Sequence, residues 1–280
     1  MKISFLSCLA AIALYSCTTS AFIQHTPTLA NTGMHRSKGE FNGNFYYSTG
    51  SSSANSYEIG DGASPHQSVN GIQAQGSFAL TPFLALQASY MNSDEKGGSK
   101  ENGTKNIVYS YKRNITETGI AYFKSLSGDN NLFVELGLGA GFGQYRANEL
   151  NSLLVPGGRY YDHNVSKIYF QPSVYFISKN VHLGSGIKMY SLNFNDIKTD
   201  YTRQERESRQ LPIDNNLSTF NFEVFLKTDF FLNNMPQLGF SLQALLANSG
   251  GEQFSGNLND SNFGIGLRFR LGKEKMTGKD

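Results

Sequence analysis

The chain has 280 residues, with 24 Lys and Arg against 22 Asp and Glu, a formal net charge of +2. A near-neutral chain lacks the basic face that a nucleic-acid partner requires, so no such partner is expected. Frequent glycine (29 residues), 13% aromatic residues and only 16% charged residues favour an all-β protein of alternating strands.

The N-terminus has the features of a bacterial export signal. A basic start precedes an apolar stretch from Ile3 to Tyr15, which is too short to cross a bilayer as a helix. The stretch ends in Leu14-Tyr15-Ser16-Cys17, which is similar to a lipobox, the motif whose Cys receives lipid. We therefore expect a signal peptide over residues 1–16 and acylation of Cys17. The alternative is ordinary cleavage near Ser20-Ala21, with Cys17 discarded.

Both cysteines, Cys8 and Cys17, lie in this leader, so a lipidated mature chain would contain no disulfide. No later stretch reaches 18 apolar residues, so no transmembrane helix is expected. Residues 17–37 lack periodicity and are interpreted as a lipid-anchored linker. A barrel is expected over residues 38–272, followed by a periplasmic tail at 273–280.

From Lys38 on, runs of period-2 alternation are separated by turn residues, which is typical of antiparallel strands. The pattern predicts ten strands, at 38–49, 69–80, 83–92, 107–124, 131–145, 164–178, 181–195, 217–231, 237–248 and 261–272.

The connections between these strands alternate in length. Those after the even-numbered strands are short, whereas those after the odd-numbered strands are long and polar, at 50–68, 93–106, 146–163, 196–216 and 249–260. Tight periplasmic turns and large outer loops are typical of an up-and-down transmembrane β-barrel. Since ten strands return the chain to its starting side, both termini are expected in the periplasm.

The two faces of the strands differ in chemistry. One face is apolar and is expected to meet lipid, as at Leu136, Leu138, Phe222, Leu267 and Phe269. The other face points into the lumen and carries four acids and five bases, namely Glu117, Glu135, Glu223, Asp229, Lys167, Lys188, Lys227, Arg268 and Arg270.

Unpaired charges in a narrow interior are costly, so these nine groups are expected to pair and to plug the lumen. Tyr169, Tyr175 and Phe225 also point inward, opposite strands with inward glycines, which favours a filled interior. The alternative is that the same charges line a narrow aqueous pore.

Two further expectations concern individual positions in the strands. Pro172 removes a ladder donor in mid-strand, which predicts a bulge there. Because the chain lacks Trp, Tyr and Phe are expected to form the aromatic girdle. The candidates are Tyr46, Tyr47, Tyr90, Tyr109, Tyr145, Tyr190 and Phe194.

The chain resembles the small outer-membrane β-barrel proteins of diderm bacteria, and among them lipobox-bearing barrel lipoproteins. The resemblance is carried by Pro27-Thr-Leu-Ala-Asn-Thr-Gly33, by Lys38-Gly-Glu-Phe41 and by the strand–turn–strand from Ile72 to Tyr90. It implies insertion by the outer-membrane assembly machinery and contact with outer-membrane lipid. It brings no catalytic motif.

Asp162-His163 is the one pair with catalytic potential, because omptin-type proteases are ten-stranded barrels with acid and His groups at their outer rim. Such pairs are more often solvated loop residues, and no spacing selects an acidic partner. The five histidines show no metal-ligand spacing, and no cofactor motif is present, so neither metal nor cofactor is expected. The mixed-charge run Arg203–Arg209 is interpreted as a solvated loop, with contact to lipopolysaccharide as the alternative.

The sequence therefore predicts a non-enzymatic outer-membrane barrel lipoprotein with an envelope structural or surface-interaction role. Two alternatives remain: an omptin-like hydrolase acting at the loop rim, and a lipid-tethered soluble barrel that binds a ligand.

Overall fold

The structure is a computed structural model that describes residues 28–51, 64–101, 104–149, 158–208, 217–247 and 260–272. The expected signal peptide, Cys17 and the tail at 273–280 lie outside these residues. Among the described residues, no helix combines the length and apolar character needed to cross a membrane.

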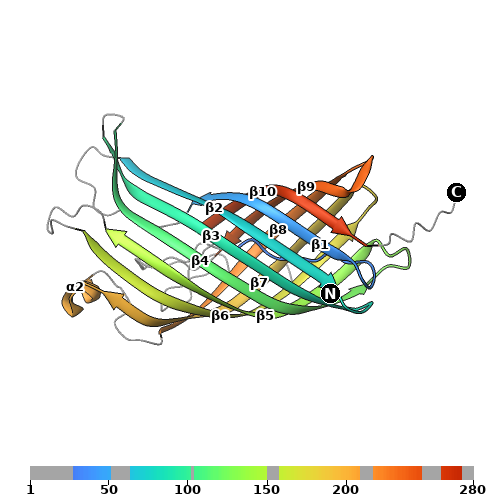
Figure 1. Cartoon of the computed structure of the whole chain (residues 1–280), viewed down its shortest axis with the longest axis horizontal. Coiled ribbons are helices and arrows are strands. Elements are labelled where there is room, and N and C mark those ends of the chain that lie inside the picture. Colours follow the sequence, from blue (N-terminus) through green and yellow to red (C-terminus); the bar gives the residue numbers. More distant parts are fainter. Residues whose placement is uncertain are drawn as a thin grey trace, which may run out of the picture.

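The described chain forms a closed all-β barrel of ten antiparallel strands in up-and-down order, which confirms the predicted fold class (Figure 1). The first and last strands close it, with Phe41 opposite Leu271 and Ser51 opposite Ser261. The strands are β1 (Phe41–Ser51), β2 (Ser64–Ala79), β3 (Leu84–Glu101), β4 (Thr104–Ser125), β5 (Leu132–Glu149), β6 (Arg159–Ile177), β7 (Val181–Thr199), β8 (Leu217–Leu232), β9 (Met235–Ala247) and β10 (Asp260–Leu271).

The two ends of the barrel differ. At the short-turn end, the strands are joined by residues 80–83, 126–131, 178–180 and 233–234. At the opposite end, which we name the long-loop end, lies the short helix α2 (Arg203–Ser208) (Figure 1).

Several strands extend further toward the long-loop end than predicted. The expected loop at 93–106 contracts to a connection of two residues, because β3 continues to Glu101 and β4 begins at Thr104. Likewise, β5 continues to Glu149 and β6 begins at Arg159. Their polar outward residues there resemble a loop sequence, although the period-2 alternation continues.

The outward face carries an apolar band of exposed large side chains. Along β5, Leu136, Leu138 and Phe142 are 40%, 54% and 66% exposed, and Gln144 next faces outward. On β6 the outward apolar residues begin at Ile168, preceded by the exposed Asn164. Other members of the band are Phe45, Ile72, Phe78, Leu86, Ile120, Leu183, Phe220, Leu226, Phe240, Phe263, Ile265, Leu267 and Phe269.

Two positional expectations were wrong. Register is unchanged across Pro172, with Phe170 opposite Met189 and Ser173 opposite Gly186, so the proline interrupts the ladder without a bulge. Among the girdle candidates, Tyr47 and Tyr90 are exposed. Four others are buried, because they occupy inward positions of the alternation: Tyr46, Tyr145, Tyr190 and Phe194.

Candidate functional site: the lumen and its N-terminal segment

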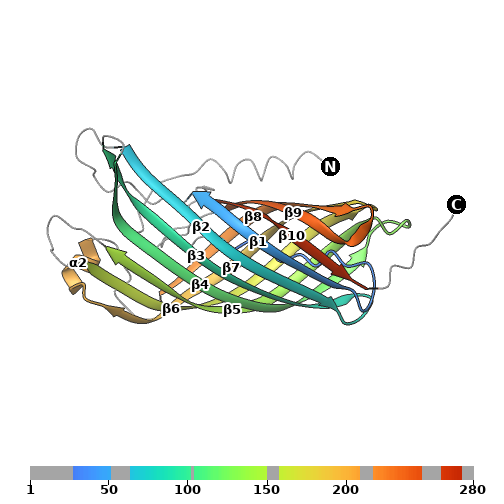
Figure 2. The ribbon, with the colours of Figure 1, turned by 45° about the horizontal axis from the view of Figure 1, so that its top comes forward.

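Residues 28–36, which we name the lumen segment, lie inside the barrel (Figures 1 and 2). Thr28 to His35 are all buried, with Thr28 1% and Asn31 5% exposed. This differs from the linker expected over residues 17–37. The segment has no strand periodicity because the barrel wall binds it through side chains, not through a backbone ladder.

The C-terminal end of the lumen segment is held at the short-turn end of the barrel. The Arg36 guanidinium donates to the Ile177 carbonyl at 2.8 Å, and the Arg36 backbone N–H donates to Glu40 Oε2 at 2.8 Å. Glu40 also accepts from Arg270 Nε at 2.7 Å. Gly39, with φ near +80°, adopts the left-handed conformation that glycine tolerates, and its N–H donates to the Ala79 carbonyl. The chain therefore turns directly from the lumen into β1.

In the middle of the lumen, wall side chains bond the backbone of the lumen segment. The Gln73 amide accepts from the Leu29 N–H and donates to the Leu29 carbonyl, both at 2.9 Å, as a neighbouring strand would. Arg268 donates to the Gly33 carbonyl at 3.1 Å. Asn31 in turn donates to the Ala88 and Gly76 carbonyls of the wall at 2.9 and 3.2 Å. A buried non-ladder backbone thus finds the partners that it requires.

Thr28 meets a buried ion triad at the other end of the lumen segment. Glu117 bridges Lys167 at 2.8 Å and Lys188 at 2.7 Å, and all three side chains are at most 3% exposed. The Thr28 hydroxyl lies 3.2 Å from Lys167 Nζ, 3.0 Å from Lys188 Nζ and 3.2 Å from Glu117 Oε1. Two cations on one carboxylate need such an additional acceptor.

All nine charged residues assigned to the lumen from the sequence point inward, and eight are at most 2% exposed. Besides the triad, Arg268 pairs with Asp229 at 2.9 Å, and Glu135 accepts from Gln87 at 3.0 Å. Lys227 donates to the Thr32 carbonyl at 3.4 Å. Glu223 is fully buried and faces Lys167 and Lys188. Arg270 pairs with Glu40, an acid absent from the sequence-based set.

Glycines make room for large inward side chains. The Tyr169 ring lies over Gly139 and Gly119, where an added Cβ would collide with it. The Gly264 position faces the Leu29 side chain of the lumen segment in the same way. Small residues opposite large ones fill the interior of a narrow barrel.

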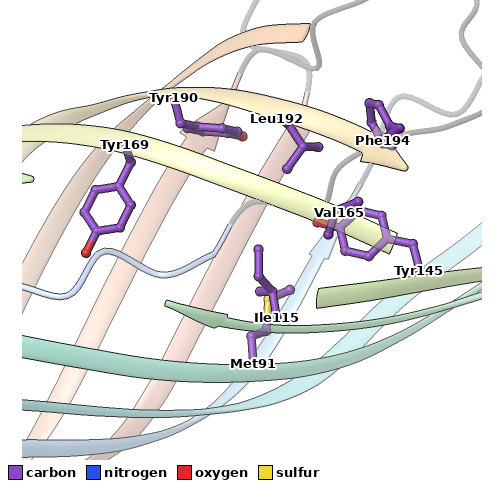
Figure 3. Packing of buried hydrophobic residues seen from close by; sticks show 8 residues of the cluster. All are labelled: Met91, Ile115, Tyr145, Val165, Tyr169, Tyr190, Leu192 and Phe194. Carbon is purple, nitrogen blue, oxygen red and sulfur yellow. The ribbon is translucent and has the colours of Figure 1, made fainter. Parts of the chain in front are cut away.

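Toward the long-loop end, the lumen wall changes to an apolar lining, which we name the outer cluster (Figure 3). It comprises Met91, Ile115, Tyr145, Val165, Tyr169, Tyr190, Leu192 and Phe194, from β3 to β7. The buried pair of Arg113 and Glu95, 2.6 Å apart, stands beside it, with the Arg113 guanidinium over the Tyr111 ring. The sequence reading missed this pair because it placed Glu95 in a loop.

The Asp162-His163 pair does not assemble into a catalytic dyad. Asp162 faces outward and pairs with Arg146 at 3.0 Å, whereas the His163 ring faces inward among Tyr145, Tyr161 and Phe194. Neither His163 ring nitrogen has a hydrogen-bond partner. His182 likewise points inward and packs against Phe231 at 4.6 Å between ring centroids. Within the described ranges, no group of three or more His, Cys, Asp or Glu could hold a metal ion.

No protein-family model matches the chain, and no curated protein matches it in sequence. Solved structures match its fold. The translocator domain of the autotransporter NalP from Neisseria meningitidis aligns with a TM-score of 0.52 at 6% identity, over 85% of this chain and 91% of that one. The outer membrane protease OmpT from Escherichia coli aligns at 0.44 and 10% identity, over 88% and 100% of the two chains. The first of these alignments shows that the chain shares its barrel fold with an autotransporter translocator domain.

Proposed function

We propose that the protein is a non-enzymatic barrel of the bacterial outer membrane that its own lumen segment keeps closed, with an envelope structural or surface-interaction role. The burial of residues 28–35 inside the wall is the observation that carries the proposal. A pore of the same strand number would leave this space to water.

The apolar band supports the membrane location. Its side chains encircle the barrel, whereas a soluble protein rarely exposes a contiguous apolar patch above a few hundred Å². This argues against the lipid-tethered soluble barrel. Outer-membrane lipid is the proposed partner of this face, with the assembly machinery as the partner during insertion. The helix α2, with Arg203 and Arg206 at the long-loop end, is the proposed contact for lipopolysaccharide phosphates.

The opposite orientations of Asp162 and His163 leave the hydrolase alternative without an assembled site on that pair. The expected acylation of Cys17 remains part of the proposal, with the barrel itself supplying most of the membrane retention. The variant Cys17→Ala should therefore change processing while the protein stays in the membrane fraction after a high-salt wash.

Planar-bilayer recording tests the closed state. The purified protein should show no steady conductance, and a variant lacking residues 28–35 should show openings, because the polar walls then face water. Heat-modifiable migration on gels verifies that both proteins are folded. Steady openings of porin size from the unmodified protein would refute a closed barrel.

A further inference from the structure

The lumen segment runs in a defined direction. At Arg36 it bonds the Ile177 carbonyl beside the short turn at 178–180. At Thr28 it bonds Glu117, Lys167 and Lys188, which lie well inside their strands. Followed from β1 back toward the N-terminus, the chain therefore moves away from the short-turn end.

Thr28 lies at the margin of the apolar band nearer the long-loop end. Its partner Lys167 directly precedes Ile168, the first outward apolar residue of the band on β6. Its partner Glu117 lies opposite Gly141 of β5. The next residue, Phe142, is the last apolar outward residue of β5, and the following outward residue is Gln144. The eight residue steps from Thr28 to Arg36 reach about 26–29 Å when extended, which matches a band of about 25 Å.

A return of the chain before Thr28 through this part of the lumen would meet contacts that already fill it. Thr28 to His35 are all buried against the walls, and the ion triad closes around Thr28. A second passage of chain would have to displace those contacts.

We propose that the N-terminal end of the mature chain lies on the long-loop side of the membrane, having passed through its own barrel. This replaces the periplasmic N-terminus expected from strand number alone. The inference rests on the proposed function only in identifying that side as the cell surface. It holds for both cleavage alternatives, because Cys17 and Ala21 both precede Thr28.

The reach of the chain suits this location. Eleven residue steps from Thr28 to Cys17 span up to about 36–40 Å. The strand β6 continues for eight residues beyond Lys167, about 26 Å along its length. Cys17 can therefore pass the rim, where its acyl chains would enter the outer leaflet.

Epitope accessibility in intact cells tests the inference. An epitope with flexible linkers is inserted in the full chain between Ile23 and Gln24. Matched insertions between Gly128 and Asp129 mark the short-turn end, and insertions between Thr202 and Arg203 mark the long-loop end. Each variant must retain heat-modifiable migration, and a site between Ala21 and Phe22 replaces the first where migration is lost.

The N-terminal epitope should bind antibody in intact cells to the same extent as the epitope at Thr202. The epitope at Gly128 should bind only after the outer membrane is permeabilised. The inference would be overturned if the N-terminal epitope, like the Gly128 epitope, bound antibody only after the outer membrane is permeabilised. If the Gly128 epitope were exposed and the Thr202 epitope hidden, the proposed orientation would fail, and the inference would still be decided by which marker the N-terminal epitope follows.

Discussion

Inside the apolar band, the lumen is polar and occupied by the lumen segment. Beyond the band, the same strands enclose rings and aliphatic side chains beside the buried ion pair of Arg113 and Glu95. The polarity of β6 inverts along its length. Ile168 faces outward in the apolar band, and Lys167 faces the lumen. Nearer the long-loop end, Asn164 faces outward and Val165 faces inward. The strand keeps period 2 throughout, so with the proposed membrane location the inversion marks where the surrounding solvent changes from lipid to water.

The contrast has a physical reason. With the proposed membrane location, lipid solvates the outer face of the band, so the interior must hold the polar groups and satisfy each of them. Beyond the band, water solvates the outer face, and an apolar interior stabilises the projecting strands as the core of a soluble barrel does. The lumen segment supplies backbone acceptors to Arg268 and Lys227, which the walls alone would leave less well satisfied.

The largest expected effect is at the ion triad. The variant Glu117→Ala leaves Lys167 and Lys188 buried without their shared carboxylate and should lower the free energy of unfolding by about 3–5 kcal/mol. Urea unfolding in lipid vesicles measures it. An unchanged midpoint would show that water already solvates these lysines, and that the lumen segment does not seal the band.

A second variant locates the edge of the band. Leu138→Arg places a charge on the lipid face of β5 and should cost about 2–4 kcal/mol. Gln144→Arg, six residues along the same outward face, should change stability by less than about 0.5 kcal/mol. The same vesicle unfolding measures both variants. An equal loss of unfolding free energy at the two positions would mean that the band does not end between Leu138 and Gln144.

A smaller effect is expected within the lumen segment itself. Asn31→Ala removes the side-chain donor to the Ala88 and Gly76 carbonyls and should cost about 0.5–1.5 kcal/mol. Because the segment is loosened, the variant should also show brief openings in planar-bilayer recordings. If the variant is as stable as the parent and shows no conductance, contacts other than those of Asn31 hold the lumen segment in place.

Much of the band could be predicted from sequence. Alternation identified the ten strands and the inward position of all nine lumen charges, because successive side chains of a strand point to opposite faces. The same alternation places Glu40 inward, two residues before Asn42 and within the strand predicted at 38–49. The partner of Arg270 could therefore have been found by including Glu40 in the inward set.

The lumen segment could not be found in this way. Its residues bond walls that are distant in sequence, such as Leu29 with Gln73, and no local pattern encodes such contacts. The surplus of one base over four acids was no signal for it either, because Glu40 supplies the fifth acid. The projecting ends of β3 to β6 were missed because polar outward residues there resemble loops.

The position and direction of the lumen segment can be tested most directly by disulfide trapping in the folded barrel. Leu29→Cys/Gly264→Cys should link, because the Gly264 position faces the Leu29 side chain. Gly33→Cys/Ser77→Cys should link nearer the short-turn end, because a Cβ added at Gly33 lies 2.7 Å from Ser77 Oγ. The crossed pair Leu29→Cys/Ser77→Cys should stay reduced. Mass spectrometry of the heat-modifiable form should find both links, whereas linkage of the crossed pair alone, or of none, would contradict a lumen filled by residues 28–36.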